Sequence, residues 1–236
     1  MGNNENNKLH QLGDLIYAAI EENTIIESEP WAVERVERVL KRLHAARGKG
    51  DEFSVVIPWI EEFTAFTAPG RYIFFARRLF QLCDSDDMAA MVIAHEMSHH
   101  DLGHMDVFPD WFGDVTNLDV QVVILALYRI VETRIHGPEL ERDADLNALE
   151  LCIKAGYDGQ TCIRVFKKLE KFALDMGDIQ GVYGPDDPDG DAPDDASWSA
   201  QIRTWLYQRK RGYLSVRDRH ESLLNYLDQI TGGNPR

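Results

Sequence analysis

Apolar residues recur at helical spacing in the segment 29–47. They lie three or four positions apart, at Val33, Val36, Leu40 and Leu43. Residues at this spacing share one face of an α-helix, and charged residues occupy most of the intervening positions. Gly48 follows directly, as glycine commonly does after the last turn of a helix. We therefore predict an amphipathic helix over Glu29–Arg47.

Three short apolar runs come next along the chain. They cover residues 53–58 (FSVVIP), 62–68 (EFTAFTA) and 71–77 (RYIFFAR). Runs of this length, rich in aromatic and β-branched residues, are typical of β-strands, and the Pro69-Gly70 pair between the last two is typical of a turn. This part of the chain is therefore predicted to form a small β-sheet.

The rest of the chain has mainly helical patterns. Asp84 or Ser85 can cap a helix that contains MAAMVIAHEMSHH (88–100), and this helix is apolar on most sides, so we expect it to be central and buried. Further helical patterns lie just before Gly137-Pro138, over 139–155, from near Asp158, and from Trp198 to the end. The sequence thus predicts an α+β fold, mainly helical, with a small β-sheet.

The composition narrows the classes of function. With 44% hydrophobic residues the chain can bury a core, and its net charge of −15 argues against partners such as nucleic acid or an anionic membrane surface. The longest apolar run, 120–131, is interrupted by Gln121 and Arg129 and falls well short of the roughly 20 residues that span a bilayer. The polar start of the chain, 1–13, lacks the pattern of a signal peptide. We expect a soluble protein without a membrane span.

The cysteines indicate a reducing compartment. Cys83, Cys152 and Cys162 are odd in number, lack the paired spacing of a disulfide scaffold or thiolate zinc site, and have apolar neighbours. We interpret them as small buried hydrophobic residues and expect a cytoplasmic protein.

Two segments differ in composition from the rest of the chain, namely residues 1–28 and the acidic stretch around 184–197. Residues 1–28 are interpreted as a polar N-terminal extension, and 29–236 as a single domain with an acidic loop insertion around 184–197 (GPDDPDGDAPDDAS). The spacing of acids in this insertion does not match an EF-hand calcium loop, so we interpret it as a solvated loop or a disordered insertion.

The predicted buried helix carries the sequence His95-Glu96-Met97-Ser98-His99. Residues four apart share a helical face, so both imidazoles can reach one metal ion, and Glu96 can touch a metal-bound water without being a ligand. This spacing is a signature of zinc metalloproteases. The alternative is a pair of core histidines, each hydrogen-bonded to a neighbour. Two imidazoles and a carboxylate are costly in so apolar a helix unless something satisfies them, as a zinc ion does.

A catalytic zinc usually has three protein ligands and one open position. The best third candidate is Glu141, in the sequence ERDAD (141–145). Glu141 and Asp145 share a helical face, so one carboxylate can bind the ion while the other orients a ligand imidazole. The same acids also fit a solvated start of a helix, and spacing alone does not separate the two interpretations.

Several blocks in this order resemble the M48 family of gluzincin metallopeptidases. They are AFTAPGRYI (65–73), HEMSHHDLGH (95–104) and ERDADLNALELCIKAGYD (141–158), within a similarity that runs from about Glu29 to Tyr226. The resemblance implies a zincin-type metallopeptidase domain, in a soluble form, with its small sheet next to the metal helix. It also implies one zinc ion per chain.

The resemblance assigns roles to individual residues. It makes His95, His99 and Glu141 the zinc ligands, Glu96 the general base, and Asp145 the aspartate that supports the site. The chain departs from the family pattern at Thr64, where asparagine is usual, and at Arg71, which replaces a glycine. His100 and His104 are interpreted as ordinary polar residues at the end of the metal helix.

One late histidine, His220, falls near a family histidine that approaches the metal or the tetrahedral intermediate. Glu221 stands where proline usually follows, and no arginine follows at the usual distance. His220 is the family-suggested donor to the oxyanion, with Arg219 or Arg217 as alternatives.

Together these observations predict a zinc-dependent endopeptidase that hydrolyses unfolded or extended protein substrates, with Glu96 activating a zinc-bound water. A substrate peptide could add as a strand to one of the strands that flank Pro69-Gly70. Three alternatives remain open at this stage: a latent enzyme held shut by His220, an inactive metallopeptidase-fold protein that acts as a binding or chaperone-like module, and another hydrolase such as an amidase. The sequence predicts neither the natural substrate nor the oligomeric state.

Overall fold

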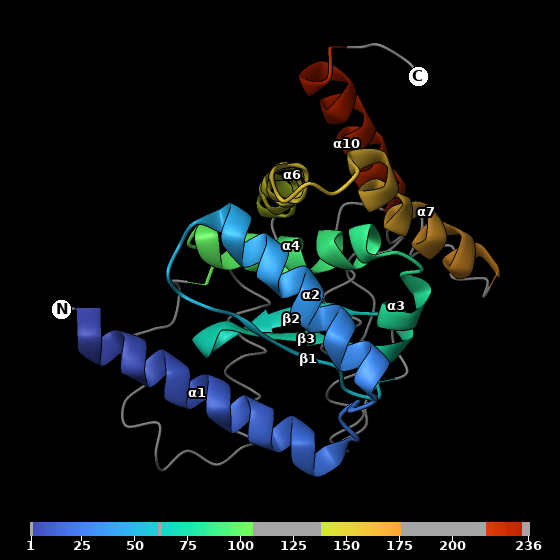
Figure 1. The fold of residues 1–236 in the computed structure, drawn as a ribbon. Coiled ribbons are helices and arrows are strands. Elements are labelled where there is room, and N and C mark those ends of the chain that lie inside the picture. The colour runs from blue at the N-terminus through green and yellow to red at the C-terminus, as the bar shows by residue number, and fades with distance from the viewer. Residues whose placement is uncertain (1, 61–62, 106–137, 176–215, 233–236) are drawn as a thin grey trace, which may run out of the picture.

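The computed structural model describes residues 2–60, 63–105, 138–175 and 216–232, which form a mainly helical fold around a small sheet (Figure 1). Its elements, in chain order, are α1 (Gly2–Asn23), α2 (Pro30–Arg47), β1 (Ser54–Val56), β2 (Ala65–Ala68), η1 (Pro69–Arg71), β3 (Tyr72–Phe75), α3 (Arg77–Leu82), α4 (Asp86–Asp101), α6 (Pro138–Lys154), α7 (Gly159–Asp175) and α10 (Val216–Ile230). The predicted α+β class is confirmed.

The described sheet has three strands in the order β1-β3-β2. β1 runs parallel to β3, with Val55 opposite Ile73. β2 runs antiparallel to β3, with Phe66 opposite Phe74, because the 3-10 turn η1 reverses the chain between them. Gly70 adopts a left-handed conformation in this turn, with φ 74°, which glycine reaches without steric cost. The predicted turn at Pro69-Gly70 is therefore present.

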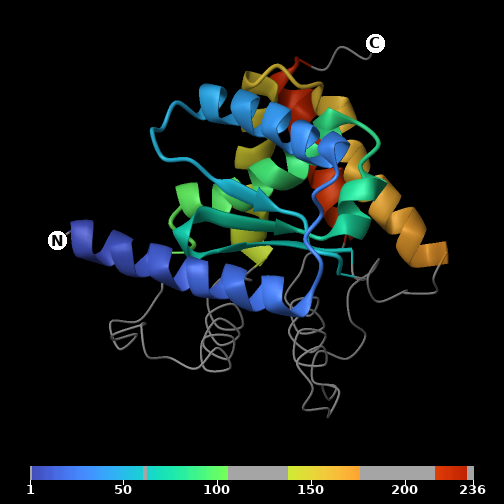
Figure 2. The ribbon, with the colours of Figure 1, turned by 60° about the horizontal axis from the view of Figure 1, so that its bottom comes forward.

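Alternate side chains of β3 face two different layers. Phe74 belongs to a small core shared with Leu12 and Ile16 of α1, whereas Ile73 and Phe75 belong to the main core with α2 and α4. Figure 2 shows α1 on one side of the sheet and α2 on the other. The sheet is therefore covered on both faces, and α6, α7 and α10 extend the main core beyond α4.

Helix α2 matches the predicted helix 29–47 but buries a slightly different face. Its buried residues are Ala32, Val36, Val39 and Leu43. Val33, predicted to be on the apolar stripe, is 39% exposed, because it lies about 100° around the helix from Ala32. Gly48 ends the helix in the left-handed conformation, with φ 70°, as its position in the sequence suggested.

Helix α1 occupies most of the segment interpreted as a polar N-terminal extension. One face of it is buried against the sheet through Leu12, Ile16, Ala19 and Ile20. Gly13 lies so close to η1 that a Cβ atom there would be 2.2 Å from the carbonyl oxygen of Pro69. Helix α1 is thus packed on the domain through residues 9–20, whereas the domain boundary at residue 28 stays a prediction.

Helix α4 is central, as predicted, and is buried along nearly its whole length. The hydroxyl of Ser85 caps it by accepting a hydrogen bond from the backbone N–H of Met88 at 3.3 Å. Asp86 in its first turn accepts hydrogen bonds from Arg35 and Arg38 of α2. α4 packs against α6 and α7, and this places its ligand residues beside the first turn of α6.

All three cysteines are free and buried, as predicted. Within the described ranges, no helix is both long and apolar enough to cross a bilayer. The helical pattern before Gly137, the acidic insertion at 184–197 and the segment 198–215 lie outside the described residues.

Candidate metal centre

Three buried side chains from two helices converge on one point. His95 and His99 of α4 bring their Nε2 atoms to 3.1 Å from each other. Glu141 of α6 places Oε2 3.4 Å from His95 Nε2 and Oε1 3.5 Å from His99 Nε2. One donor atom from each of the three residues lies within 4.8 Å of the others. The spacing between His95 and His99 and the separate motif around Glu141 therefore meet in space.

The packing of α4 against α6 explains this convergence. His95 and His99 lie one helical turn apart, on the face of α4 that meets α6. Next to them, Asn147 of α6 donates a hydrogen bond to the hydroxyl of Ser98 at 2.9 Å. This contact ties the two helices together close to the cluster. The alternative of a solvated acidic helix start does not describe Glu141, whose exposed fraction is 0%.

The donor set suits zinc. Two imidazole nitrogens and one carboxylate are ligands that zinc accepts, and three protein ligands are the number found at catalytic zinc sites. All three side chains are buried, so a cation held between them would offset the cost of burying the Glu141 carboxylate. The chemistry of the residues present therefore fits a zinc ion.

A second set of residues supports the first ligand. Asp145, one turn after Glu141 on α6, lies with Oδ1 2.9 Å from Nδ1 of His95. Arg219 of α10 donates to both oxygens of Asp145, at 2.8 Å from Nε and 2.6 Å from Nη2. The guanidinium also lies over the ring of Phe166, 4.8 Å from its centroid. Asp145 thus holds His95 with Nε2 directed toward the cluster, as a carboxylate does at many metal-bound histidines.

These contacts raise the pKa of His95 and lower the pKa of Asp145. Burial and the charge of Arg219 act to lower the pKa of His95, but the hydrogen bonds to Asp145 and Glu141 outweigh them and raise it to about 9. Burial acts to raise the pKa of Asp145, but Arg219 and His95 outweigh it, so that this pKa lies below its ordinary value. Asp145 is therefore a carboxylate at neutral pH, able to accept the Nδ1 proton of His95.

His99 has a supporting neighbour of its own. Its Nδ1 atom lies 3.0 Å from Nδ1 of His104, so one ring donates a hydrogen bond to the other. His104 is only 8% exposed, and burial lowers its pKa. The interpretation of His104 as an ordinary polar residue at a helix end was incomplete, because it contacts a residue of the cluster. The turn at Gly103, with φ 73°, brings the chain back toward α4.

His100 turns away from the cluster. Its Nε2 atom lies 2.6 Å from the hydroxyl of Thr67 on β2, and its ring meets the edge of Phe53. It links the metal helix to the sheet.

The two residues assigned catalytic roles have different surroundings. Glu96 is 2% exposed and directly follows His95 on α4. His220 is buried on α10, and burial lowers its pKa. The charged groups that act on His220 are Lys167, Glu170 and Glu221, none of which belongs to the metal cluster. The catalytic role of His220 therefore stays a prediction.

The neighbour of His220 is the residue of α10 that reaches the cluster. Besides contacting Asp145, Arg219 places Nη2 3.3 Å from Nδ1 of His95 and Nη1 3.6 Å from Oε2 of Glu141. Sequence reasoning named Arg219 only as an alternative oxyanion donor. Its pairing with Asp145 joins residues 74 positions apart, and only the packing of α10 against α6 and α7 brings them together.

Comparison with known proteins bears on the same region. The sequence profile of Peptidase family M48 matches residues 28–131, a range that contains His95, Glu96 and His99 and ends before Glu141. No curated protein matches the chain. The resemblance found in the sequence is thus confirmed over residues 28–131, which match peptidase family M48.

Proposed function

We propose that this chain is a zinc-dependent endopeptidase in which His95, His99 and Glu141 hold the metal and Glu96 is the general base. The observation that carries the proposal is the convergence of three buried donor groups within 4.8 Å of one another. The match to a peptidase family over the segment with both histidines supports peptide hydrolysis as the reaction.

The chemistry divides between the metal and the protein. When bound, zinc polarises a carbonyl group and makes water more acidic. Glu96 accepts the proton of the attacking water and passes it to the leaving nitrogen of the peptide bond, as a general base and then a general acid. Its place directly after His95 on α4 keeps this carboxylate next to the ligand set without making it a ligand.

Asp145 and Arg219 act as positioning residues in this proposal. Asp145 accepts the Nδ1 proton of His95, which leaves Nε2 with its lone pair directed at the metal. Arg219 holds Asp145 through two hydrogen bonds and keeps it ionised. His220 remains the proposed donor to the oxyanion.

The substrate class follows from the family match and from the position of the sheet. We propose extended or unfolded protein segments, because a peptide in extended form can lie along a strand. β3, the strand after Pro69-Gly70, is paired on both sides, whereas β2 is an outer strand of the described sheet and packs against α4. The strand before Pro69-Gly70 is therefore the better candidate of the two that the sequence left open.

Zinc content and casein cleavage, measured on the same preparation, test the proposal. We expect about one zinc per chain and cleavage of unfolded casein that a chelator abolishes. Glu96→Gln should keep its zinc and lose about 10²–10⁴-fold in turnover, because the general base is gone. Glu139→Gln on the exposed start of α6 is the matched control and should cleave like the wild type.

Other results of these measurements would favour one of the alternative functions. Full zinc without cleavage by the wild type would favour a latent or inactive binding protein, and His220→Ala would then test latency. Wild-type turnover by Glu96→Gln would overturn the mechanism. Failure to take up zinc after remetallation would overturn the metal site itself.

A further inference from the structure

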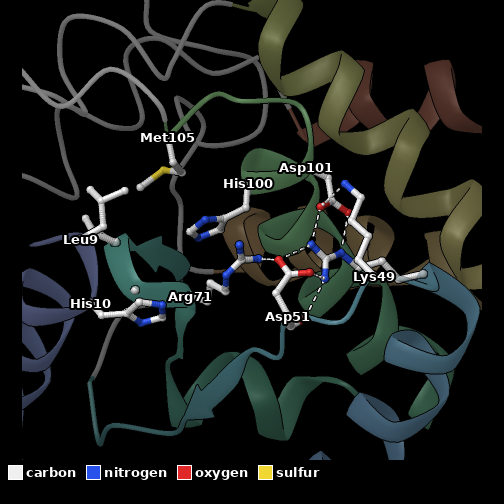
Figure 3. A pocket seen from close by; sticks show the side chains of 11 residues that line it. Leu9, His10, Lys49, Asp51, Arg71, His100, Asp101 and Met105 are labelled. Carbon is white, nitrogen blue, oxygen red and sulfur yellow. Dashed lines mark hydrogen bonds and ion pairs between the residues drawn. The ribbon is translucent and has the colours of Figure 1, made fainter. Parts of the chain in front are cut away.

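A cavity of about 170 Å³ lies where α1, the loop after α2, η1 and the end of α4 meet (Figure 3). None of the three proposed zinc ligands lines it. Its walls carry three cationic side chains, Arg47, Lys49 and Arg71, together with the carboxylates of Asp51 and Asp101. The charges on the walls therefore leave one positive charge in excess.

The two carboxylates are already used by the innermost arginine. Arg47, whose side chain is 3% exposed, binds Asp51 at 2.9 Å and Asp101 at 2.6 Å. The ammonium group of Lys49 lies 2.7 Å from Asp101, and Arg71 forms an ion pair with Asp51. The charges thus alternate along a chain that begins and ends with a cation. This excess is local, because the protein as a whole carries a net charge of −15.

Arg71 holds its place at a conformational cost. Its φ is 67°, and it is the only residue other than glycine with a positive φ in the described part of the chain. A side chain in this left-handed region is disfavoured, and such residues cluster at functional sites. The strain is consistent with a requirement for the guanidinium at this position. Burial and the nearby charge of Arg47 lower the pKa of Arg71, as expected where positive charge accumulates.

The guanidinium of Arg71 faces the open part of the cavity, and helix α1 borders the cavity close to η1. Figure 3 shows the Arg71 guanidinium between Asp51 and the open region bordered by His10, Met105 and His100. Asp51 is the only acidic residue that Arg71 contacts among the described residues. The backbone of α1 packs tightly against η1, since a Cβ on Gly70 would lie 3.0 Å from the Cα of His10. The backbone of α1 and that of η1 therefore lie in close contact beside this opening.

We propose that this cavity binds a small oxyanion, with Arg71 as its principal donor and Lys49 as a second cation. A guanidinium offers several N–H groups in a planar fork that matches phosphate and carboxylate oxygens, and one carboxylate uses only part of them. The volume is that of about five or six water molecules, which accommodates a phosphate or acetate ion. Such an anion would balance the excess charge.

Binding of an anion in this cavity would also affect α4, the helix that carries His95 and His99. Asp101 is the last residue of α4, two positions after His99, and its carboxylate is part of the charge chain. An anion that orders Arg71 and Lys49 would therefore fix the end of α4 and raise the stability of the folded state by mass action.

Calorimetric titration of the zinc-loaded protein with inorganic phosphate, and separately with acetate, tests this proposal. We expect saturable binding of at least one ion, and the preferred ion tells whether the site favours a tetrahedral phosphate or a planar carboxylate. Arg71→Gly should weaken that binding about tenfold or more, because it removes the main charged donor. This variant should fold, since glycine adopts the left-handed conformation freely.

Three further variants sharpen the test. Lys49→Gln should weaken binding less than Arg71→Gly, and Arg71→Lys should retain part of the affinity because it keeps the charge. Lys154→Gln removes one positive charge from an exposed position outside the cavity and should bind like the wild type. Equal affinity in the wild type and Arg71→Gly, or no saturable binding of either ion, would overturn the proposal. Because Arg71 is not part of the metal cluster, this result is independent of whether the protein cleaves peptides.

Discussion

Arg219 on α10 donates two hydrogen bonds to the carboxylate of Asp145 on α6, at 2.8 and 2.6 Å. Oδ1 of Asp145 in turn lies 2.9 Å from Nδ1 of His95. A helix near the end of the chain is thereby linked through one carboxylate to the first proposed zinc ligand. Burying the Asp145 carboxylate is costly without the guanidinium of Arg219 beside it. We therefore expect the loss of either residue to disturb the other.

Replacing Arg219 should therefore weaken zinc binding. In Arg219→Gln, Asp145 loses its guanidinium partner and no longer holds His95 in one orientation. We expect a loss of about 10–100-fold in zinc affinity, the usual effect of removing a residue that orients a metal ligand. Competition with a chelator measures this affinity, and activity at saturating zinc shows how much of the defect is due to metal loss alone.

Arg217→Gln is the matched control on the same helix. Arg217 pairs with Glu170 of α7, whereas Arg219 pairs with Asp145. The control should retain wild-type zinc affinity, and Arg219→Lys should recover part of it through its charge. Equal zinc affinities in the wild type and Arg219→Gln would show that Arg219 only packs the helices together.

The parts of the site that rest on helical spacing could be predicted from the sequence. His95 and His99 are one turn apart on α4, and Glu141 and Asp145 are one turn apart on α6, so each pair shares a face in any structure that keeps the helix. The contact of Arg219 could not be predicted in this way. It depends on the angle and register of helix packing, which no local pattern specifies.

The sequence of the N-terminal helix contains a pattern that indicates a buried face, although its first residues are polar. The high content of asparagine in residues 2–7 suggested a polar extension. However, Leu12, Ile16 and Ile20 recur every four residues, which is the spacing of a buried helical face, and all three are buried on the sheet. The amphipathic part of α1 therefore follows directly on its polar, asparagine-rich start.

Gly13→Ala tests how firmly α1 is attached. On an exposed helix this change is stabilising by about 1 kcal/mol, because alanine is the better helix former. Here the added Cβ would lie 2.2 Å from the carbonyl oxygen of Pro69 and 2.9 Å from the ring of Tyr72. Since backbone must move to relieve this clash, we expect a net destabilisation of about 1–3 kcal/mol in urea unfolding.

Gly50→Ala provides the comparison. A Cβ at Gly50 meets nothing within 4 Å and its φ is not positive, so its unfolding free energy should change little. If Gly13→Ala were as stable as the wild type or more so, α1 would not be packed on η1 in solution.

His100 connects the metal helix to β2, and its half-buried ring is uncharged at neutral pH. Burial, together with the positive charge of Arg71, lowers its pKa to about 3, against the small opposing effect of Asp101. The neutral ring keeps its contacts, with Nε2 2.6 Å from the hydroxyl of Thr67 and the ring edge against Phe53.

The pH dependence of stability follows from this shift. Between the unfolded pKa of about 6.5 and the folded pKa, the unfolded chain binds a proton at this residue that the folded chain does not. His100 therefore contributes stability that is present above pH 6.5 and falls with pH, by at most about 1.4 kcal/mol per pH unit. In His100→Gln that contribution is absent, although the amide can still bond Thr67. From pH 6.5 to 5 the wild type should lose about 1.6 kcal/mol more unfolding free energy than the variant, as measured by urea titration at both pH values. Parallel losses in the two proteins would mean that His100 is protonated, or exposed to water, in the folded state.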